Sequence, residues 1–430
     1  ASNTKAFTAA GLGILVSRDS IHWDDRVIDY LPYFRMYDPW VTQNITIRDI
    51  LSHRTGLNTF SGDLIWYDSE YSREEVIRRA RYLKPSFGFR TKFGYSNIMY
   101  LAAGQIIPKV TNKTWDEFMK QELFLPLDMS STNTSINGNE NIENLAYPHF
   151  TNKDKTIRIQ YINWDNMAPA GGINSNISDM IKWISMLLNY GRYNGKQILN
   201  GEVLYEMWKP QTLNSNHNVD PTIHFHAYGV GWDLFDYHGY KIVNHSGGID
   251  GMISHVGLVP KEKLGFVILT NSNNYLPSAL MYKIIDHVLD IQEKDWSELF
   301  LQYKKLSDEE RENLKKQEEE KPVKNTSPSL PLDKFTGEYG GKLYGNVQVS
   351  LENGHLKVLF LPAPRFKATL YHWHYNTFKL VWDDYPSLPG GKVHFTIDQE
   401  GKPEQMKIDV PNPDFDFTEL QLFKVIPDEK

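Results

Sequence analysis

The composition of this chain limits what the protein can be. Its 430 residues carry a formal net charge of -7, which gives no electrostatic reason to expect binding to nucleic acid or to an anionic membrane. The absence of cysteine excludes disulfides, thiol catalysis and cysteine-bound metal, and no apolar run is long enough to span a bilayer. The length predicts two domains, or three.

The first five residues place two reactive side chains at the start of a predicted buried helix. Ser2 and Lys5 form an S-x-x-K pattern, and an apolar, alanine-rich run follows from Ala6 to Val16. A helix N-terminus favours developing negative charge, and Lys5 lies about one turn after Ser2 on the same face. Because a serine needs a neighbouring base, the pair predicts a serine nucleophile. The alternative is a capping serine and a solvated lysine.

Two helices are predicted before the next polar cluster. Thr46 is expected to cap a short helix that Gly56 closes, and His53 and Arg54 are interpreted as structural residues with backbone partners near the helix end. A charged helix is predicted from Ser72 to Leu83. No chemistry is assigned to this stretch.

Tyr95 and Asn97 stand at a glycine-preceded turn that enters the apolar helix predicted from Ile98 to Val110. A tyrosine can act as a base toward a serine when nearby cations hold it as phenolate, and an asparagine can orient a substrate amide. The same Y-x-N pattern occurs at Tyr161 and Tyr344, but not at such a turn. A packed aromatic with a bonded hydroxyl is the alternative for Tyr95.

The middle of the chain carries two more predicted helices and a glycine turn. An amphipathic helix is predicted from Trp115 to Met129, and another from Ser178 to Tyr190. Between them, Met167 to Ser175 contains a Gly-Gly pair that lacks the lysine and spacing of a phosphate loop. A wall beside a site is the favoured interpretation of this turn.

A change of period predicts an antiparallel sheet. Its four consecutive strands are expected at Tyr228–Leu234, Lys241–His245, Ile253–Val259 and Leu264–Asn271. At the end of the second strand, His245, Ser246, Gly247 and Gly248 combine an imidazole, a hydroxyl and glycines that permit close backbone approach. This edge is suited to binding an extended substrate and to donating an N–H to an oxyanion. A glycine-rich hairpin turn is the alternative.

The C-terminal third changes character twice. A long helix is predicted from Tyr282 to Leu306, followed by a charged helix and linker over 307–331. From Leu332 to the end, about eight short strands predict a small closed barrel. His372 and His374 share one strand face, as metal ligands would, but no third ligand is evident, so no metal or other cofactor is expected.

The ordered motifs Ser2-x-x-Lys5, Tyr95-x-Asn97 and His245-Ser246-Gly247 resemble the serine β-lactamase and DD-peptidase superfamily. The resemblance is to its class C branch, with D-aminopeptidase and esterase relatives (peptidase family S12), and extends over about 290 residues. The C-terminal region resembles the lipocalin-like domain of some S12-type hydrolases. The resemblance implies an α/β (α+β) serine hydrolase domain at 1–306, a linker at 307–331 and a β-barrel domain at 332–430.

The resemblance also implies roles for single residues. Ser2 resembles the acylated nucleophile, and Lys5 and Tyr95 resemble the proton-transfer pair. Asn97 resembles the residue that binds the substrate amide, and the pocket lining would be formed by His245, Ser246 and Gly247. The oxyanion hole would be formed by the N–H groups of Ser2 and Gly248. Many β-lactamases have lysine where this chain has His245, so β-lactamase activity is not favoured. A charged imidazole would lose its hold on a substrate carboxylate above roughly pH 6.5.

The implied reaction is hydrolysis, through an acyl-enzyme, of amide bonds in small peptides, including peptides with D-residues. An esterase or weak β-lactamase with the same residues is the near alternative, and a non-catalytic scaffold is the alternative from another class. No cofactor is implied, and the expected partner is a small peptide, amide or ester substrate. Formation of homo-oligomers through the C-terminal barrel stays an open alternative. The resemblance favours a periplasmic or secreted protein. Because family members have strands and a helix before the nucleophile, we expect N-terminal strands to be missing here and residues 1–430 alone not to form a working enzyme.

Overall fold

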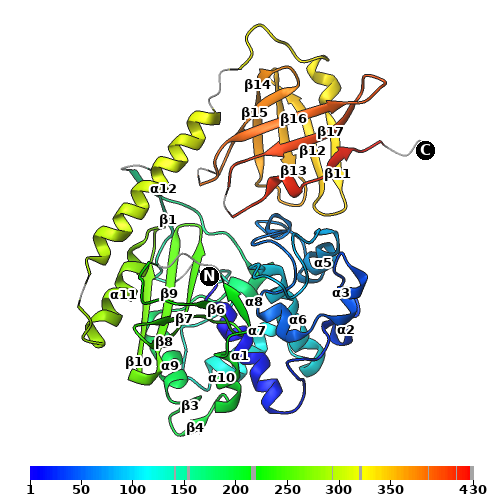
Figure 1. Cartoon of the computed structure of the whole chain (residues 1–430). Helices are drawn as coiled ribbons and strands as arrows, with labels where there is room; N and C mark the ends of the chain where they lie inside the picture. Colours follow the sequence, from blue (N-terminus) through cyan, green and yellow to red (C-terminus); the bar gives the residue numbers. More distant parts are fainter. Residues whose placement is uncertain are drawn as a thin grey trace. The chain divides into compact units, whose positions relative to one another are not determined.

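The computed structural model describes residues 1–139, 142–152, 155–214, 219–292, 294–318, 322–385, 387–412 and 414–426. These group into two compact units, which are described separately (Figure 1). The first unit contains Ala1–Thr59 and Pro85–Lys305, and the second contains Phe60–Lys84 and Leu306–Lys430. Glu319, Glu320 and Lys321 of the predicted linker lie outside the described residues. The sequence-based domain boundaries remain a proposal.

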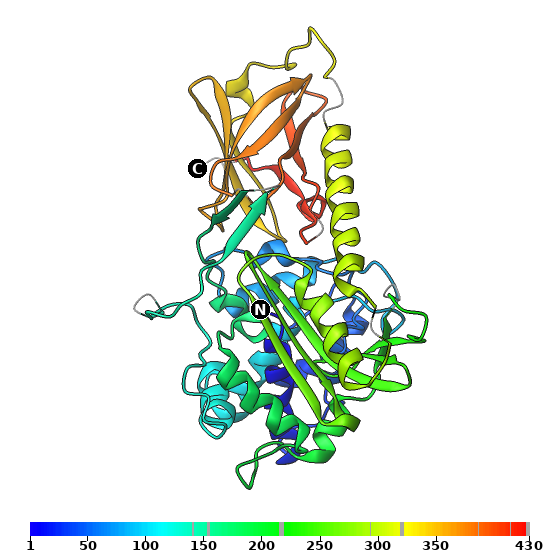
Figure 2. The ribbon, with the colours of Figure 1, turned by 90° about the vertical axis from the view of Figure 1, so that its left-hand side faces the viewer.

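A six-stranded antiparallel sheet, coloured green in Figure 2, organises the first unit. Its strands follow the order β10-β9-β8-β7-β6-β5. Its strands are β5 (Thr212–Asn214), β6 (His226–Tyr228), β7 (Asp233–Tyr237), β8 (Tyr240–Ile249), β9 (Met252–Val259) and β10 (Leu264–Thr270). The antiparallel sheet predicted from the sequence is confirmed.

Two details of the predicted sheet are wrong. The strand expected over Tyr228–Leu234 is broken between β6 and β7, because Gly231 takes a left-handed φ of +81° and passes close to the backbone of α1 (Thr4–Ser17). The tetrapeptide from His245 to Gly248 does not form a hairpin turn, since β8 continues through it to Ile249.

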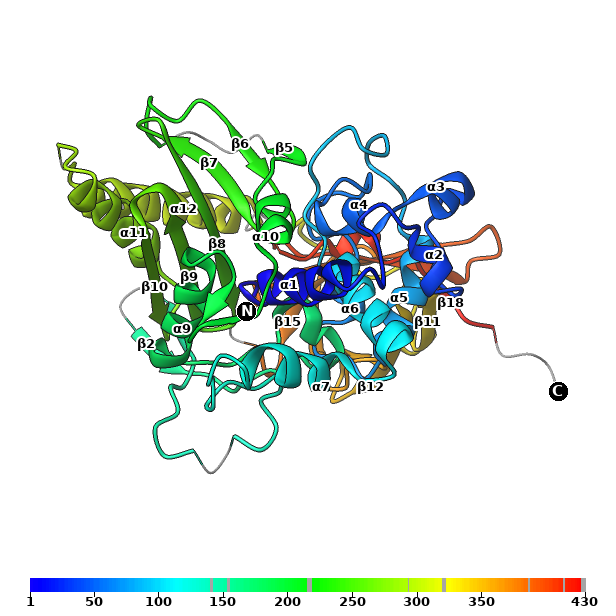
Figure 3. The same ribbon diagram turned by 90° about the horizontal axis from the view of Figure 1, so that it is seen from below.

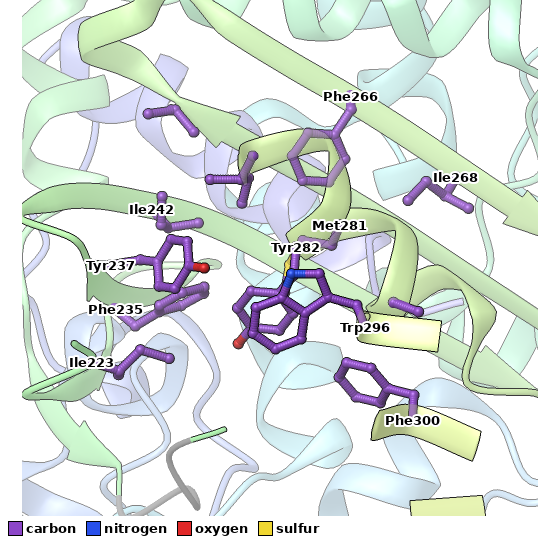
Figure 4. Packing of buried hydrophobic residues seen from close by; sticks show 13 residues of the cluster. Ile223, Phe235, Tyr237, Ile242, Phe266, Ile268, Met281, Tyr282, Trp296 and Phe300 are labelled. Atoms are coloured by element: carbon purple, nitrogen blue, oxygen red, sulfur yellow. The ribbon is translucent and has the colours of Figure 1, made fainter. Parts of the chain in front are cut away.

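One face of the sheet packs on α11 (Leu276–Val288) and the start of α12 (Trp296–Glu318). Figure 4 shows the apolar cluster between them, in which the ring centroids of Tyr282 and Trp296 lie 4.4 Å apart. The single helix predicted from Tyr282 to Leu306 is therefore wrong. The chain reverses after α11, and Trp296 Nε1 donates to the buried carboxylate of Asp286 at 2.6 Å.

The other face of the sheet packs on α9 (Ile177–Leu188). A Cβ added at Gly265 of β10 would lie 2.2 Å from Ile184 Cγ2, whereas the neighbouring Phe266 points into the cluster on the opposite face. Successive strand residues alternate between faces, so the sheet is covered on both sides.

Helix α1 is buried and runs through the middle of the first unit (Figure 3). Every residue from Thr4 to Leu15 is buried, and burying side chains such as Phe7 and Leu12 contributes about 2 kcal/mol each. A Cβ added at Gly11 would lie 2.3 Å from Met119 Cε, so the Met119 side chain would have to shift to admit a larger residue there. The buried helix predicted from the alanine-rich run is confirmed.

The other helices of the first unit lie around α1, some in contact with it and some farther from it. They are α2 (Val27–Tyr30), α3 (Pro39–Asn44), α4 (Ile47–Leu51), α6 (Asn97–Thr111), α7 (Trp115–Met119), α8 (Ala168–Gly171) and α10 (Gly201–Met207), with the two hairpins β1 (His149–Asn152) with β2 (Lys155–Arg158) and β3 (Arg192–Tyr193) with β4 (Lys196–Gln197). Thr46 caps α4 in a capping box, as expected. No helix among those described is both long and apolar enough to cross a membrane.

Arg54 has the structural role expected for it. Its Nε donates to the buried carboxylate of Asp49 at 2.6 Å, and Arg90 binds the other oxygen at 2.7 Å. Burial alone would raise the pKa of Asp49, but the hydrogen bonds from Arg90, Thr46 and Arg54 lower it below its usual value. This buried ion pair fastens α4 to the chain that leads to Tyr95.

The second unit contains a closed antiparallel barrel whose eight strands follow in sequence order. They are β11 (Gly337–Gly341), β12 (Gly345–Glu352), β13 (His355–Phe360), β14 (Lys367–His374), β15 (Thr377–Trp382), β16 (Gly391–Ile397), β17 (Pro403–Asp409) and β18 (Leu422–Lys424). Pairing of β11 with β18 closes it, and this confirms the predicted barrel. The helix α5 (Arg73–Arg79) belongs to the same unit.

Candidate active site

Ser2 and Lys5 meet at the start of α1. Lys5 Nζ donates to Ser2 Oγ at 3.1 Å, as their spacing predicts. The Lys5 side chain is completely buried, and its amine also donates to the backbone carbonyl of Ala170 at 2.9 Å. That carbonyl belongs to α8, so the glycine turn expected to form a wall is a short helix that contacts the lysine.

Asn97 and Tyr95 reach the same amine from the start of α6. Asn97 Oδ1 accepts from Lys5 Nζ at 2.7 Å in a buried setting. The Tyr95 ring lies beside the lysine, with its centroid 4.7 Å from Nζ. The structure therefore brings together Ser2, Lys5, Tyr95 and Asn97 from two helices that are far apart in the sequence.

One residue holds the backbone on both sides of Tyr95. Gly94 N–H donates to the carbonyl of His53 at 2.8 Å, and Ser96 N–H donates to His53 Nδ1 at 3.0 Å. The Tyr95 ring packs on the imidazole, with ring centroids 4.3 Å apart. His53 is buried and has the backbone partners expected from the sequence, and it lies beside Tyr95.

The start of α1 is fastened to the sheet next to Ser2. Asn3 Nδ2 donates to Ser254 Oγ on β9 at 2.8 Å. On β8, a Cβ added at Gly247 would lie 2.7 Å from Ser2 N and 2.8 Å from Ser254 Oγ. Only glycine permits this approach, so Gly247 decides how close β8 comes to the serine. Sequence reasoning missed Asn3 and Ser254, because their pairing depends on the tertiary fold.

The residues around Gly247 point in different directions. Side chains alternate along a strand, so His245 shares the face of Gly247, and Ser246 is exposed on the opposite face. Gly248 is exposed and follows directly. The structure therefore brings His245 and Gly247 to the Ser2 side of the sheet, whereas the Ser246 side chain is directed to the other side.

His245 is an uncharged residue in this site. Its Nδ1 donates to the carbonyl of Ser246 at 2.5 Å, which leaves Nε2 to accept from the Tyr228 hydroxyl at 2.9 Å. Burial, and then the positive charge of Lys5, lower the pKa of His245 to about 3. This environment favours the neutral imidazole near neutral pH.

The positive charge of Lys5 reaches both histidines of the site. Burial first, and then the positive charge of Lys5, lower the pKa of His53 well below its usual value. Because its Nδ1 accepts from Ser96, the neutral His53 ring carries its proton on Nε2. Within the described ranges no group of three or more His, Asp or Glu side chains could hold a metal ion. The site offers a hydroxyl, an amine, a phenol and neutral imidazoles, which is a set suited to nucleophilic catalysis.

Comparison with known proteins agrees with this geometry. The family model described as Beta-lactamase matches residues 1–287, and the model described as a domain of unknown function (DUF3471) matches residues 321–424. Over 375 residues the chain is 32% identical to the unguisins hydrolase ungD' of Aspergillus campestris (strain IBT 28561). That match covers 81% of this chain and 67% of the relative.

Solved structures show the same folds. The octameric penicillin-binding protein homologue from Pyrococcus abyssi aligns with a TM-score of 0.59 at 18% identity, over 99% of this chain and 87% of that one. The D-amino acid amidase from Ochrobactrum anthropi SV3, complexed with L-phenylalanine, aligns with a TM-score of 0.51 at 25% identity, over 64% of this chain and 75% of that one.

Proposed function

The chain belongs to the Beta-lactamase family, and on that premise we propose that it is a serine hydrolase that cleaves amide bonds of small peptides through an acyl-enzyme on Ser2. The observation that carries the proposal is the buried Lys5 amine, which contacts Ser2 Oγ and Asn97 Oδ1 beside the Tyr95 ring. These four side chains are the ones that the chemistry needs.

In the proposed reaction, Ser2 Oγ attacks the carbonyl carbon of the substrate and its proton passes to the Lys5–Tyr95 pair. The pair then donates the proton to the leaving nitrogen as the carbon–nitrogen bond breaks. A water molecule then attacks the carbonyl carbon of the resulting ester and gives a proton to the same pair. The pair returns a proton to Ser2 Oγ as the bond between that oxygen and the carbonyl carbon breaks, which releases the acid and regenerates Ser2. Asn97 binds the substrate amide.

The N–H groups of Ser2 and Gly248 are proposed to bind the oxyanion of the tetrahedral intermediate. The register supports a role for β8 in holding the substrate. Among the described strands, β7 pairs with Tyr240 to Asn244 only, so the edge from His245 to Ile249 has no strand partner on that side. An extended peptide that follows this edge would pass beside Ser2, because Gly247 brings β8 close to it.

The substrate class rests on the chemistry and on the relatives together. The chain resembles a protein named as an unguisins hydrolase and one named as a D-amino acid amidase, which supports amide substrates and D-residues. A neutral His245 gives a substrate carboxylate no positively charged partner, which supports amide substrates that lack a free carboxylate. Esters remain the second candidate, since the same residues act on them. Assembly of several copies through the barrel also stays a proposal.

A panel of substrates tests the reaction class. D- and L-aminoacyl amides, D-Ala-D-Ala peptides, nitrocefin and short esters are offered at equal concentration, with a Ser2→Ala variant as the blank. We expect kcat/KM for an amide with a D-residue to exceed that for nitrocefin by at least about a hundredfold, which is about 2.7 kcal/mol of transition-state stabilisation. Turnover of esters alone would replace the peptidase assignment with an esterase. No turnover above the blank would favour either the scaffold or the expectation that residues 1–430 alone do not form a working enzyme.

The neutral state of His245 predicts an absence of pH dependence. Since its pKa is lowered to about 3, the imidazole stays uncharged from pH 5.5 to 8.5. The ratio of KM values for a substrate with a free carboxylate and its amidated analogue should therefore be constant across that range. A ratio that rises about tenfold per pH unit above pH 6.5 would show that a charged imidazole binds the carboxylate.

A further inference from the structure

We propose that one end of the C-terminal barrel is a binding surface for the chain's own segment Phe60–Lys84, and that through this segment the barrel fixes the backbone around Tyr95. The binding surface is independent of the reaction, whereas its effect on catalysis rests on the proposed role of Tyr95.

The surface consists of loops from one end of the barrel. In an antiparallel barrel whose strands follow in sequence order, the loops β11–β12, β13–β14, β15–β16 and β17–β18 all lie at the same end. Residues of all four contact Phe60–Lys84: Leu343 and Tyr344 from the first loop, Pro362 and Phe366 from the second, Tyr385 from the third, and Phe415 and Glu419 from the fourth. The segment thus spans the whole end of the barrel.

The contacts at one side of the surface are polar. The Glu419 carboxylate accepts from the backbone N–H of Gly62 at 2.8 Å and from the hydroxyl of Ser61. Tyr385 donates to Asp68, which also contacts Arg365. Burial raises the pKa of Glu419 despite these hydrogen bonds, so this carboxylate is largely removed from water.

The other contacts are aromatic or involve backbone groups. Tyr67 is only 2% exposed, and its ring centroid lies 4.4 Å from that of Phe415 and 5.6 Å from that of Phe366. Tyr71 OH donates to the carbonyl of Tyr344 at 2.6 Å. A Cβ at Gly345 would lie 2.4 Å from that hydroxyl, so the barrel has a glycine where Tyr71 enters. The hydrogen bonds to Glu419 and Tyr344 and the buried aromatic packing of Tyr67 together hold the segment against the barrel.

The segment leaves the first unit after Thr59 and returns to it at Pro85. On either side of these points, residues 53–59 and 86–95 are joined by backbone hydrogen bonds. Ser86 N–H donates to the carbonyl of Gly56 at 2.9 Å, Arg90 N–H to that of Arg54 at 2.9 Å, and Gly94 N–H to that of His53 at 2.8 Å. The two stretches therefore form one hydrogen-bonded pair that ends at Tyr95.

Tyr95 depends on this pair for its position. Its own N–H donates to Thr59 Oγ1 at 3.2 Å, and a Cβ at the preceding Gly94 would lie 1.9 Å from the carbonyl oxygen of Leu57. Catalytic side chains must be held within about 0.5 Å of the productive geometry. Both ends of the segment lie at this pair, and the barrel contacts the segment along its length. The segment therefore restricts the backbone that carries the Tyr95 phenol.

Hydrogen–deuterium exchange on the full chain tests the proposal without relying on activity. The interface variant is Glu419→Ala with Tyr71→Phe, and the matched control is Glu352→Ala with Tyr375→Phe. The control residues lie at loops of the opposite barrel end, where Glu352 and Tyr375 are exposed. We expect exchange of the Gly94, Tyr95 and Ser96 amides to accelerate at least about tenfold in the interface variant and to stay unchanged in the control.

Acylation by a fluorophosphonate or penicillin-type probe supplies the second readout. It should slow at least about tenfold in the interface variant, with the control at the rate of the parent. If the double variant does not fold, Tyr71→Phe alone is measured, since it removes one hydroxyl and keeps the ring. Faster exchange within 60–84 while Gly94 to Ser96 exchange and acylate as in the parent would overturn the proposal. Probe labelling that persists in Ser2→Ala would instead overturn the proposed function and leave the exchange result standing.

Discussion

Replacing Ser2 with alanine is expected to lower amide hydrolysis by on the order of 10⁴-fold or more, because the substitution removes the atom that forms the acyl bond. The fold should be unaffected, since Ser2 precedes α1 and its backbone contacts do not depend on the hydroxyl. Initial rates on the best substrate of the panel give the measurement. Ser17→Ala, at the exposed end of the same helix, is the matched control and should keep the parent rate.

A Ser2→Ala protein that retains more than about a tenth of the parent rate would remove Ser2 from the mechanism, because another group would then have to perform the nucleophilic step. Contaminating hydrolase is excluded by preparing both serine variants in the same way. Loss of activity in Ser17→Ala as well would point to damage of α1 and not to lost chemistry.

Replacing Lys5 with methionine is expected to slow acylation by on the order of a thousandfold or more, because the Ser2 hydroxyl loses the partner that takes part in its proton transfer. Methionine keeps the volume of the buried side chain and avoids the cavity that alanine would leave. It leaves Asn97 Oδ1 and the Ala170 carbonyl without their lysine donor, at about 1–3 kcal/mol each, offset by removal of a buried charge.

Single-turnover labelling with the acylating probe measures this step, and thermal unfolding is followed in parallel. Lys109→Met, on the exposed part of α6, is the control. A Lys5→Met protein that is labelled at a rate within a few fold of the parent would assign the proton transfer to another group. The electrostatic effect can be checked in the same protein, since loss of the Lys5 charge should raise the pKa of His53 and His245 toward the usual range.

Much of the fold could be predicted because local patterns and tertiary structure agree. The run from Ala6 to Val16 is apolar on all sides, as a helix surrounded by other helices requires, and it forms the buried α1. Short alternating strands after Leu332 form the eight-stranded barrel. The candidate site could be located because Ser2 and Lys5 are neighbours along one helix, so their contact follows from helix geometry alone.

The features that could not be predicted depend on contacts that are distant in the sequence. After the break between α11 and α12, Trp296 donates a hydrogen bond back to Asp286. At the bend between β6 and β7, Gly231 approaches α1 closely. The structural role expected for His53, with backbone partners, agrees with its hydrogen bonds from the N–H groups of Gly94 and Ser96. Its position beside Tyr95 could not be predicted, because no local pattern connects His53 to residues 94 to 96. The direction of Ser246 was open to prediction from the period of a strand, had the strand been extended through the glycines.

The most direct test of the account is to locate the acyl group. The protein is mixed with a fluorophosphonate or penicillin-type probe, quenched, and examined by intact mass spectrometry and peptide mapping. We expect one adduct per chain, carried by the peptide that contains Ser2 and lost in Ser2→Ala. An adduct of the same stoichiometry on any other residue, or labelling that persists in Ser2→Ala, would contradict the central claim that this chain acts through an acyl-enzyme on Ser2.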